Sequence, residues 1–310
     1  MTKTALLFPG QGSQRVGMGR DLALAHEVSR ATYAEADQTL GWELSQLCYE
    51  GPEERLVLTE NTQPAILVTS IAVFRALEGK GLTYDFVAGH SLGEWTALVA
   101  AGALSLPDAI RLTHLRGKYM QEAVPVGIGA MAAVMGLDLA TVSKICAEAS
   151  APGEPVSPAN LNGGGQIVLS GHTNAIDRAM PLAKTAGAKL VKKLSVSAPF
   201  HCALMQPAAD KLAMVLSEIA IDVPKVPVIA NVTAKPTQDP DEIRRLLVEQ
   251  VTAPVRWEES IQYLAGAGVT KAYELGSGAV LKGLVKRIAP TIDVTTIGEP
   301  HEVAAFGSAP

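Results

Sequence analysis

Cysteine is scarce in this sequence, which has three in 310 residues, at Cys48, Cys146 and Cys202. The number is odd, and no pair has C-x-x-C spacing, so the pattern predicts neither a disulfide framework nor a zinc site. A chain of this kind is typical of a reducing compartment. We therefore expect a cytoplasmic protein without a structural metal.

The sequence also lacks an excess of positive charge and long hydrophobic runs. The formal net charge is −5, and no basic run is dense enough to suggest a nucleic-acid surface. Proline and glycine follow too early at the N-terminus for a signal peptide, and no uncharged apolar run has the length of a membrane span. We expect neither a nucleic-acid partner nor a membrane segment.

The composition that remains is that of a folded globular protein. Apolar residues make up 48% and charged residues 18% of the chain, and 310 residues are enough to bury a full core. Predicted strands alternate with predicted helices over most of the sequence, a pattern that favours a parallel sheet covered on both faces. These strands are expected at residues 5–8, 86–89, 226–231, 271–275 and 293–297.

The alternation changes between Pro125 and Pro199. There the predicted order is strand, helix, strand, strand, helix, strand, which is the ferredoxin-like pattern. We therefore predict an α/β fold with two parts. Residues 1–124 and 200–310 form a large α/β-hydrolase-like catalytic domain with a parallel sheet, and residues 125–199 form an inserted ferredoxin-like subdomain.

One serine is bracketed by glycines where a predicted strand meets a predicted helix. Residues 87–102 read VAGHSLGEWTALVAAG, and Gly89, Ser91 and Gly93 form a G-x-S-x-G pattern. Glycine is costly inside regular structure, so two of them here indicate a backbone requirement. The pattern is typical of a sharp strand-to-helix turn that exposes a nucleophilic serine hydroxyl, although an ordinary turn serine also fits it.

A serine nucleophile needs a base, which is most often histidine. Of six histidines, His90 is adjacent to Ser91, and neighbouring side chains diverge on such a turn. His201 lies in a constrained loop, APFHC, where the predicted insertion rejoins the large domain. Domain junctions are common places for clefts, so His201 is the better candidate for the base, with a packing role as the alternative.

Two further features have possible roles in a site. The turn of residues 10–14, GQGSQ, matches neither a dinucleotide nor a P-loop motif, but it offers backbone N–H groups beside a strand end. One of these could form an oxyanion hole with the N–H of Leu92, or the segment could be a plain tight turn. Arg116 lies on a predicted helix, where an arginine is usually solvated, but Gly117 after it suggests that another element packs closely there.

Together these segments resemble the malonyl-CoA:acyl carrier protein transacylases. The similarity rests on residues 8–14 (FPGQGSQ), 89–94 (GHSLGE), 115–117 (LRG) and 200–201 (FH) and on the region of Gln250, in this order and spacing. It extends over nearly the whole chain, to about Pro300. Two positions depart from the family pattern: Ser277 stands where proline is frequent, and Trp95 where tyrosine is common.

The resemblance implies a role for each matched residue. Ser91 corresponds to the acyl-accepting nucleophile, His201 to its base, and Arg116 to the arginine that binds the free malonyl carboxylate. The backbone N–H groups of Gln11 and Leu92 correspond to the oxyanion hole, and the main-chain carbonyl of Gln250 to the group that orients the histidine. Asn160 and Asn162 resemble polar residues that line the site.

The implied activity is malonyl transfer from malonyl-CoA to the phosphopantetheine thiol of acyl carrier protein, without a metal or redox cofactor, to supply fatty acid or polyketide synthesis. We expect a monomer. A basic rim for the acidic carrier is a further hypothesis, with solvated surface side chains as the alternative. Its candidate members are Lys184, Lys189, Lys192, Lys193, Lys282, Lys286 and Arg287.

Three other functions remain open on the sequence. A serine hydrolase or thioesterase would share the G-x-S-x-G pattern, but we find no H-G-G-G segment and no clearly placed triad aspartate. A transferase of the same fold could serve polyketide synthesis or a malonate decarboxylase. A non-catalytic carrier-binding module is disfavoured by the presence of both Ser91 and His201.

Overall fold

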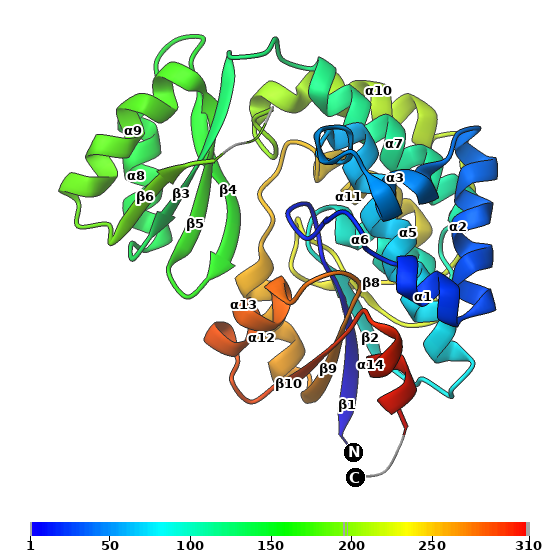
Figure 1. The fold of residues 1–310 in the computed structure, drawn as a ribbon. Helices are drawn as coiled ribbons and strands as arrows, with labels where there is room; N and C mark the ends of the chain where they lie inside the picture. Colours follow the sequence, from blue (N-terminus) through cyan, green and yellow to red (C-terminus); the bar gives the residue numbers. More distant parts are fainter. Residues whose placement is uncertain (1, 195, 197, 308–310) are drawn as a thin grey trace.

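The structure, a computed structural model, describes residues 2–194, 196 and 198–307. It contains two sheets with helices packed around them (Figure 1). The larger sheet has the strand order β10-β9-β1-β2-β7-β8, in which all neighbours are parallel except β7 and β8. The predicted mixed α/β architecture with a mainly parallel sheet is confirmed. Among the described residues, no helix has both the length and the apolar character needed to cross a membrane.

The central strands of this sheet are apolar because both of its faces are covered. In β1, Leu6 and Phe8 belong to one buried cluster, whereas Ala5 and Leu7 belong to the other. Successive side chains of a strand point to opposite faces, so a strand buried on both sides has no polar alternation. The strands are β1 Lys3–Phe8, β2 Phe86–Gly89, β7 Val228–Ile229, β8 Pro236–Thr237, β9 Val269–Leu275 and β10 Asp293–Ile297.

Helices on both faces complete the large unit. The cluster that contains Leu6 is built with α2, α5, α6, α7 and α10, and the cluster that contains Leu7 is built with α12 and α13. The helices are α1 Arg20–Ala25, α2 Glu27–Leu40, α3 Leu44–Glu50, α4 Glu53–Leu56, α5 Thr59–Glu78, α6 Leu92–Ala100, α7 Leu106–Glu122, η1 Ala203–Met205, α10 Gln206–Leu216, α11 Pro240–Glu249, α12 Trp257–Gly266, α13 Val280–Ile288 and α14 Pro300–Ala305.

A second, antiparallel sheet lies beside the first, shown in green in Figure 1. Its order is β4-β5-β3-β6, and α8 and α9 pack on it around their own apolar cluster. The strand–helix–strand–strand–helix–strand order is the predicted one; the domain boundaries at residues 125 and 199 stay a prediction. The elements are β3 Gly129–Met135, α8 Leu139–Ala149, β4 Val156–Gly163, β5 Gln166–His172, α9 Thr173–Thr185 and β6 Leu190–Lys193.

One strand of the antiparallel sheet is bonded directly to the large unit. The N–H of Val255 donates to the carbonyl of Ala159 at 2.8 Å, and the N–H of Leu161 donates to the carbonyl of Val255 at 2.9 Å. These bonds attach β4 to the segment before α12. As a result, the side chains of β4 lie next to the carboxyl ends of the parallel strands.

The start of α5 differs from the sequence prediction. The pattern predicts Thr62 as N-cap with Pro64 near the first turn, but α5 begins at Thr59 and contains Pro64. Proline has no N–H for the carbonyl of Glu60, one turn earlier. The structure satisfies that carbonyl from another helix, because His114 Nδ1 lies 2.9 Å from it. A tertiary contact therefore compensates for the helix-breaking residue.

Candidate active site

The glycines around Ser91 are required by close backbone contacts. A Cβ on Gly89 would lie 1.9 Å from the carbonyl carbon of Gly93, and a Cβ on Gly93 would lie 2.0 Å from the carbonyl oxygen of Phe8. Real Cβ contacts of that length do not occur, so only glycine allows β2, α6 and the end of β1 to meet. The sharp turn predicted from G-x-S-x-G is therefore present, with Ser91 between β2 and α6.

Ser91 itself has a strained backbone that its neighbours hold in place. Its φ is 52° and its ψ −103°, a conformation that residues with a Cβ rarely adopt. The N–H of Ser91 donates to Asn231 Oδ1 at 2.7 Å, and Asn231 Nδ2 donates to the carbonyl of Gly89 at 2.7 Å. Such strain persists only where the surroundings fix the backbone, and it is common at functional sites.

His201 meets Ser91 from the other part of the chain. His201 Nε2 lies 2.8 Å from Ser91 Oγ, and His201 Nδ1 lies 2.8 Å from the main-chain carbonyl of Gln250. A carbonyl only accepts, so Nδ1 carries the proton and Nε2 is free to accept from the serine hydroxyl. Burial, followed by the nearby charge of Arg116, lowers the pKa of His201 to about 3. The imidazole is therefore a neutral base at neutral pH.

Arg116 places a buried cation beside this pair. Its side chain is 2% exposed; Nη2 donates to Ser91 Oγ at 3.1 Å and Nη1 to Gln63 Oε1 at 2.6 Å. Burial lowers the pKa of Arg116 to about 10, and Glu94 acts in the opposite direction, so the guanidinium keeps its charge at neutral pH. Within the described part of the chain, Arg116 Nε has no hydrogen-bond partner.

The glycine after Arg116 explains why that side chain is aimed at the site. A Cβ on Gly117 would lie 2.5 Å from the carbonyl oxygen of Thr59 and 2.6 Å from Cα of Glu60. Glycine therefore lets α7 lie directly against the first turn of α5. The close packing expected from Gly117 is present, and it brings Arg116 within reach of Gln63 and Ser91.

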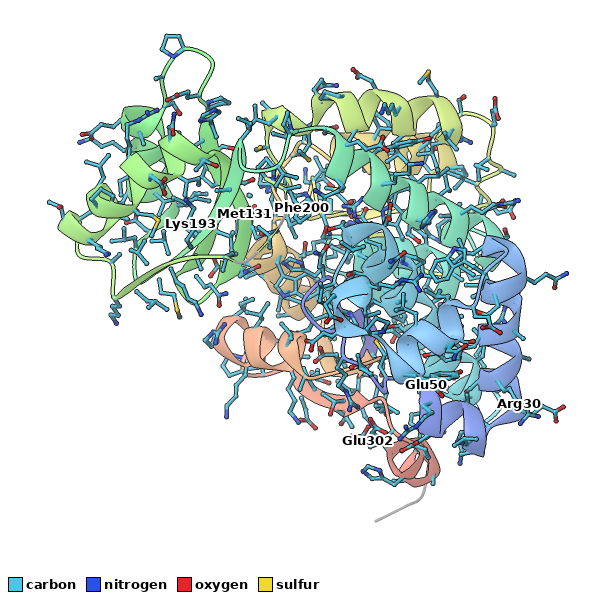
Figure 2. All side chains as sticks on the ribbon, turned by 45° about the horizontal axis from the view of Figure 1, so that its top comes forward. Arg30, Glu50, Met131, Lys193, Phe200 and Glu302 are labelled. Atoms are coloured by element: carbon cyan, nitrogen blue, oxygen red, sulfur yellow. The ribbon has the colours of Figure 1, made fainter. Side chains whose placement is uncertain are left out.

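These polar groups open into one cavity of about 140 Å³ between the two sheets. Ser91, His201 and Arg116 line it on the polar side. Its apolar wall comes largely from the antiparallel sheet and the segment that follows it; Figure 2 labels Met131 and Phe200 at this junction. The apolar lining residues are Met120, Met131, Leu194, Val196 and Phe200.

The two residues expected to form an oxyanion hole line the same cavity. Leu92 is the first residue of α6, and the N–H of a first helical residue has no partner within its helix. Gln11 lies in the turn after β1. This turn lies directly against the serine turn, and only glycine at position 10 permits it, since a Cβ there would lie 2.4 Å from the carbonyl oxygen of His90. Both residues therefore line the cavity with Ser91, and their role as an oxyanion hole stays a prediction.

The two asparagines of β4 have different positions. Asn160 lines the cavity. Asn162 does not belong to the cavity lining; its Oδ1 lies 2.8 Å from His90 Nε2. His90 diverges from the Ser91–His201 pair as expected, but it does line the cavity, with a pKa lowered by burial. Asn162 therefore contacts the site through His90.

Sequence reasoning missed three buried polar residues at the site: Gln63, which lines the cavity, and Glu94 and Asn231, which do not line it. Glu94 had a signal, because it is a carboxylate in an otherwise apolar predicted helix. Asn231 ends a predicted buried strand, which is where sites of parallel sheets lie. Gln63 precedes a proline in an apolar helix and had no comparable signal. Among the described residues, no group of at least three histidine, cysteine, aspartate or glutamate side chains has the arrangement of a metal site.

Comparison with known proteins agrees with this geometry. The family model described as acyl transferase domain matches residues 5–287. The malonyl CoA-acyl carrier protein transacylase of Escherichia coli K12 is 49% identical over 306 residues, which cover 98% of this chain and 99% of that protein. The enzyme of the same name from Bacillus subtilis 168 is 47% identical over 303 residues, 98% of this chain and 96% of that protein.

Solved structures show the same relation. The transacylase of Coxiella burnetii has a TM-score of 0.95 at 46% identity and covers 98% of this chain and 96% of its own. A malonyl-transacylase solved with its type II PKS acyl-carrier protein also has a TM-score of 0.95 at 46% identity, over 98% of both chains. This chain therefore belongs to the malonyl-CoA:acyl carrier protein transacylase family of acyl transferases.

Proposed function

We propose that this protein transfers the malonyl group of malonyl-CoA to the phosphopantetheine thiol of an acyl carrier protein, through a malonyl ester on Ser91. The observation that carries the proposal is the placement of Arg116 Nη2 3.1 Å from the same Ser91 Oγ that lies 2.8 Å from His201 Nε2. A nucleophile, its base and a buried cation thus share one cavity. A thioester that also bears a carboxylate matches this combination of groups.

In the first half-reaction, Ser91 Oγ donates its proton to His201 Nε2 and attacks the thioester carbonyl. The negative charge that develops on the carbonyl oxygen is stabilised by the N–H groups of Leu92 and Gln11. When the tetrahedral intermediate collapses, the carbon–sulfur bond breaks and His201 gives the proton to the departing CoA thiolate. The malonyl group is left as an ester on Ser91.

In the second half-reaction, His201 accepts the proton of the carrier thiol, and the thiol attacks the serine ester. Collapse of this intermediate breaks the bond to Ser91 Oγ, which recovers its proton from His201. No atom changes its oxidation state in either half, so the proposed reaction requires no redox cofactor. The proposed nucleophile, base and oxyanion donors all belong to this chain, so the proposed steps also use no metal. The sequence prediction of a cytoplasmic monomer stays a prediction.

Arg116 is proposed to bind the free carboxylate of the malonyl group. A guanidinium can bind a carboxylate with two parallel charged hydrogen bonds. The Nε of Arg116 is a buried donor with no partner among the described residues, and the guanidinium lines the cavity. A malonyl carboxylate would satisfy this donor, whereas an acetyl group would leave it without a partner.

A carrier protein is proposed to dock at the mouth of this cavity. The relative solved with an acyl-carrier protein supports such a partner. Leu194 and Val196 line the cavity directly after β6. Lys192 and Lys193 immediately precede them in the sequence, although Lys193 is paired with Asp177 at 2.7 Å. The other proposed members of the basic rim are Lys184, Lys189, Lys282, Lys286 and Arg287.

Mass spectrometry of the intact protein after exposure to malonyl-CoA tests the proposal. We expect a malonyl adduct that maps to Ser91, is absent from Ser91→Ala, and disappears when phosphopantetheinylated carrier protein is added. Malonyl-carrier protein should form in equal amount. Release of free malonate in place of malonyl-carrier protein would identify a hydrolase, and an adduct that persists in Ser91→Ala would overturn the mechanism.

A further inference from the structure

A carboxylate is buried directly behind the nucleophile, on the first turn of α6. Glu94 is 3% exposed and does not line the cavity. Its Oε2 accepts a hydrogen bond from the N–H of Asn231 at 3.0 Å and another from Gln250 Nε2 at 2.6 Å. Burying a carboxylate is costly unless it is compensated, so its position calls for an explanation. Since Glu94 cannot touch a molecule in the cavity, it must act through these neighbours.

The side chain of Gln250 connects Glu94 to Arg116. Gln250 is fully buried; its Nε2 donates to Glu94 and its Oε1 accepts from Arg116 Nη2 at 3.0 Å. An ionised carboxylate only accepts hydrogen bonds, so Glu94 requires the NH₂ group of the amide to face it. The amide oxygen is then turned toward Arg116. The carbonyl of Ser91 also accepts from Gln250 Nε2, at 3.1 Å, so Glu94 is not alone in holding the amide in this orientation, but it is the closest acceptor.

The same arrangement supplies a counter-charge to Arg116 without a direct ion pair. Arg116 donates to Gln63, Ser91 and Gln250, and no salt bridge to Arg116 is present among the described residues. Glu94 lies one amide away and still favours the charged form of Arg116. A direct ion pair would compete with a substrate carboxylate for the same donors. The intervening amide accepts a single hydrogen bond, from Nη2, and Nε keeps no partner among the described residues.

We propose that Glu94 is a positioning residue that acts through the side-chain amide of Gln250 to hold Arg116 toward the substrate carboxylate, and that it thereby sets selectivity for malonyl over acetyl thioesters. This inference rests on the proposed function. It assigns to Gln250 a second role, because the main-chain carbonyl of that residue orients His201 while its side chain orients Arg116.

Assays at pH 8 keep Glu94 ionised. Burial raises its pKa to about 7, while the hydrogen bonds from Asn231 and Gln250 and the charge of Arg116 act in the opposite direction. The measured quantity is the ratio of kcat/KM for malonyl-CoA to kcat/KM for acetyl-CoA. We expect Glu94→Gln to lower this ratio about tenfold, mainly through a higher KM for malonyl-CoA, since a hydrogen bond to a charged group is worth a change of this order.

Gln250→Met is the second variant. It removes the amide but keeps the main-chain carbonyl for His201, and we expect a similar fall in the ratio. If Glu94 acts through this amide, the double variant Glu94→Gln, Gln250→Met should have the same malonyl-to-acetyl ratio of kcat/KM as Gln250→Met alone. Glu274→Gln is the matched control. Glu274 is also fully buried, but it accepts from the N–H groups of Leu281 and Lys282, so its loss should leave the ratio unchanged.

Two results would overturn the inference. Glu94→Gln could lower malonyl and acetyl transfer by the same factor, which would show a structural role only. Alternatively, Gln250→Met could retain the wild-type ratio, which would exclude the amide whether or not Glu94→Gln folds. Failure of the proposed function is recognised separately, because the wild-type protein would then form no malonyl-carrier protein at all.

Discussion

Replacement of Arg116 by alanine should remove malonyl transfer selectively. The structure places the guanidinium 3.1 Å from Ser91 Oγ, 2% exposed, with Nε unpartnered among the described residues. A malonyl carboxylate bound there would form two charge-assisted hydrogen bonds, each worth about 1.5–3 kcal/mol. Taking the lower value for both, about 3 kcal/mol is lost in the variant, so kcat/KM for malonyl-CoA should fall about 10²-fold or more.

Acetyl-CoA is the internal control for this variant. Acetyl and malonyl thioesters present the same carbonyl to Ser91 and differ in one carboxylate. Arg116→Ala should therefore leave acetyl transfer unchanged or raise it, because a buried cation no longer faces the methyl group. Arg116→Lys should recover only part of the malonyl activity, since an ammonium cannot copy the two parallel bonds of a guanidinium.

The assay is kcat/KM for both thioesters with the wild-type protein and both variants. Arg116 also binds Gln63 Oε1 and Gln250 Oε1, so its removal leaves two buried acceptors without their donor. Structural damage from this cause would lower both rates together. An equal fall for malonyl-CoA and acetyl-CoA would therefore refute carboxylate recognition, and Arg116 would be a purely structural residue.

Three further predictions follow from the same structure. The pKa of His201 is about 3 in the folded protein and about 6.5 in the unfolded chain. Between these two pH values only the unfolded chain binds the proton, so the free energy of unfolding falls as the pH falls. Urea unfolding should show about 2 kcal/mol less loss between pH 6.5 and pH 5 in His201→Gln; an equal loss would contradict the buried neutral imidazole. Lys192→Glu should raise the apparent KM for carrier protein, more at low salt, and leave the KM for malonyl-CoA unchanged. The control variant Lys80→Glu, at the amino end of the parallel strands, should change neither KM. Equal effects of Lys192→Glu on both substrates would indicate general damage. Gly89→Ala should lower the melting temperature and abolish transfer, because its Cβ would lie 1.9 Å from the carbonyl carbon of Gly93. The control Gly283→Ala, whose Cβ would have no atom within 4 Å, should stabilise α13 by up to about 1 kcal/mol. A stable, active Gly89→Ala would show that the turn can relax.

Local patterns in the sequence were sufficient for the elements that carry the site. Residues 86–89 were predicted as a strand, and β2 has these bounds. Arg116 was predicted to lie on a helix, and it lies on α7. Apolar runs, caps and glycines act over a few residues, so they can be interpreted without the fold. The spacing of FPGQGSQ, GHSLGE and LRG along the chain was equally informative, because it matches one family.

Local patterns were insufficient where a distant contact determined the outcome. The sequence placed the N-cap of α5 at Thr62, but the helix begins at Thr59, and His114 compensates for the N–H that Pro64 lacks. Short elements such as α4 and β8 were also missed, since four and two residues carry too little periodicity to be recognised.

For the site, the sequence by itself determined the chemistry of the individual groups, and the tertiary structure decided how they are combined. The sequence alone was enough to recognise a serine between glycines, a histidine where the predicted insertion rejoins the large domain, and an arginine before a glycine. Their hydrogen bonds join residues 25 to 110 positions apart. The hydrogen bond from Gln250 to Glu94 joins residues 156 positions apart, and the one from Arg116 to Gln250 joins residues 134 positions apart. Such pairs have no local periodicity. The fold brings together the serine turn after β2, helix α7, the end of α11 and the loop before η1, and burial there sets the pKa values of Glu94 and His201.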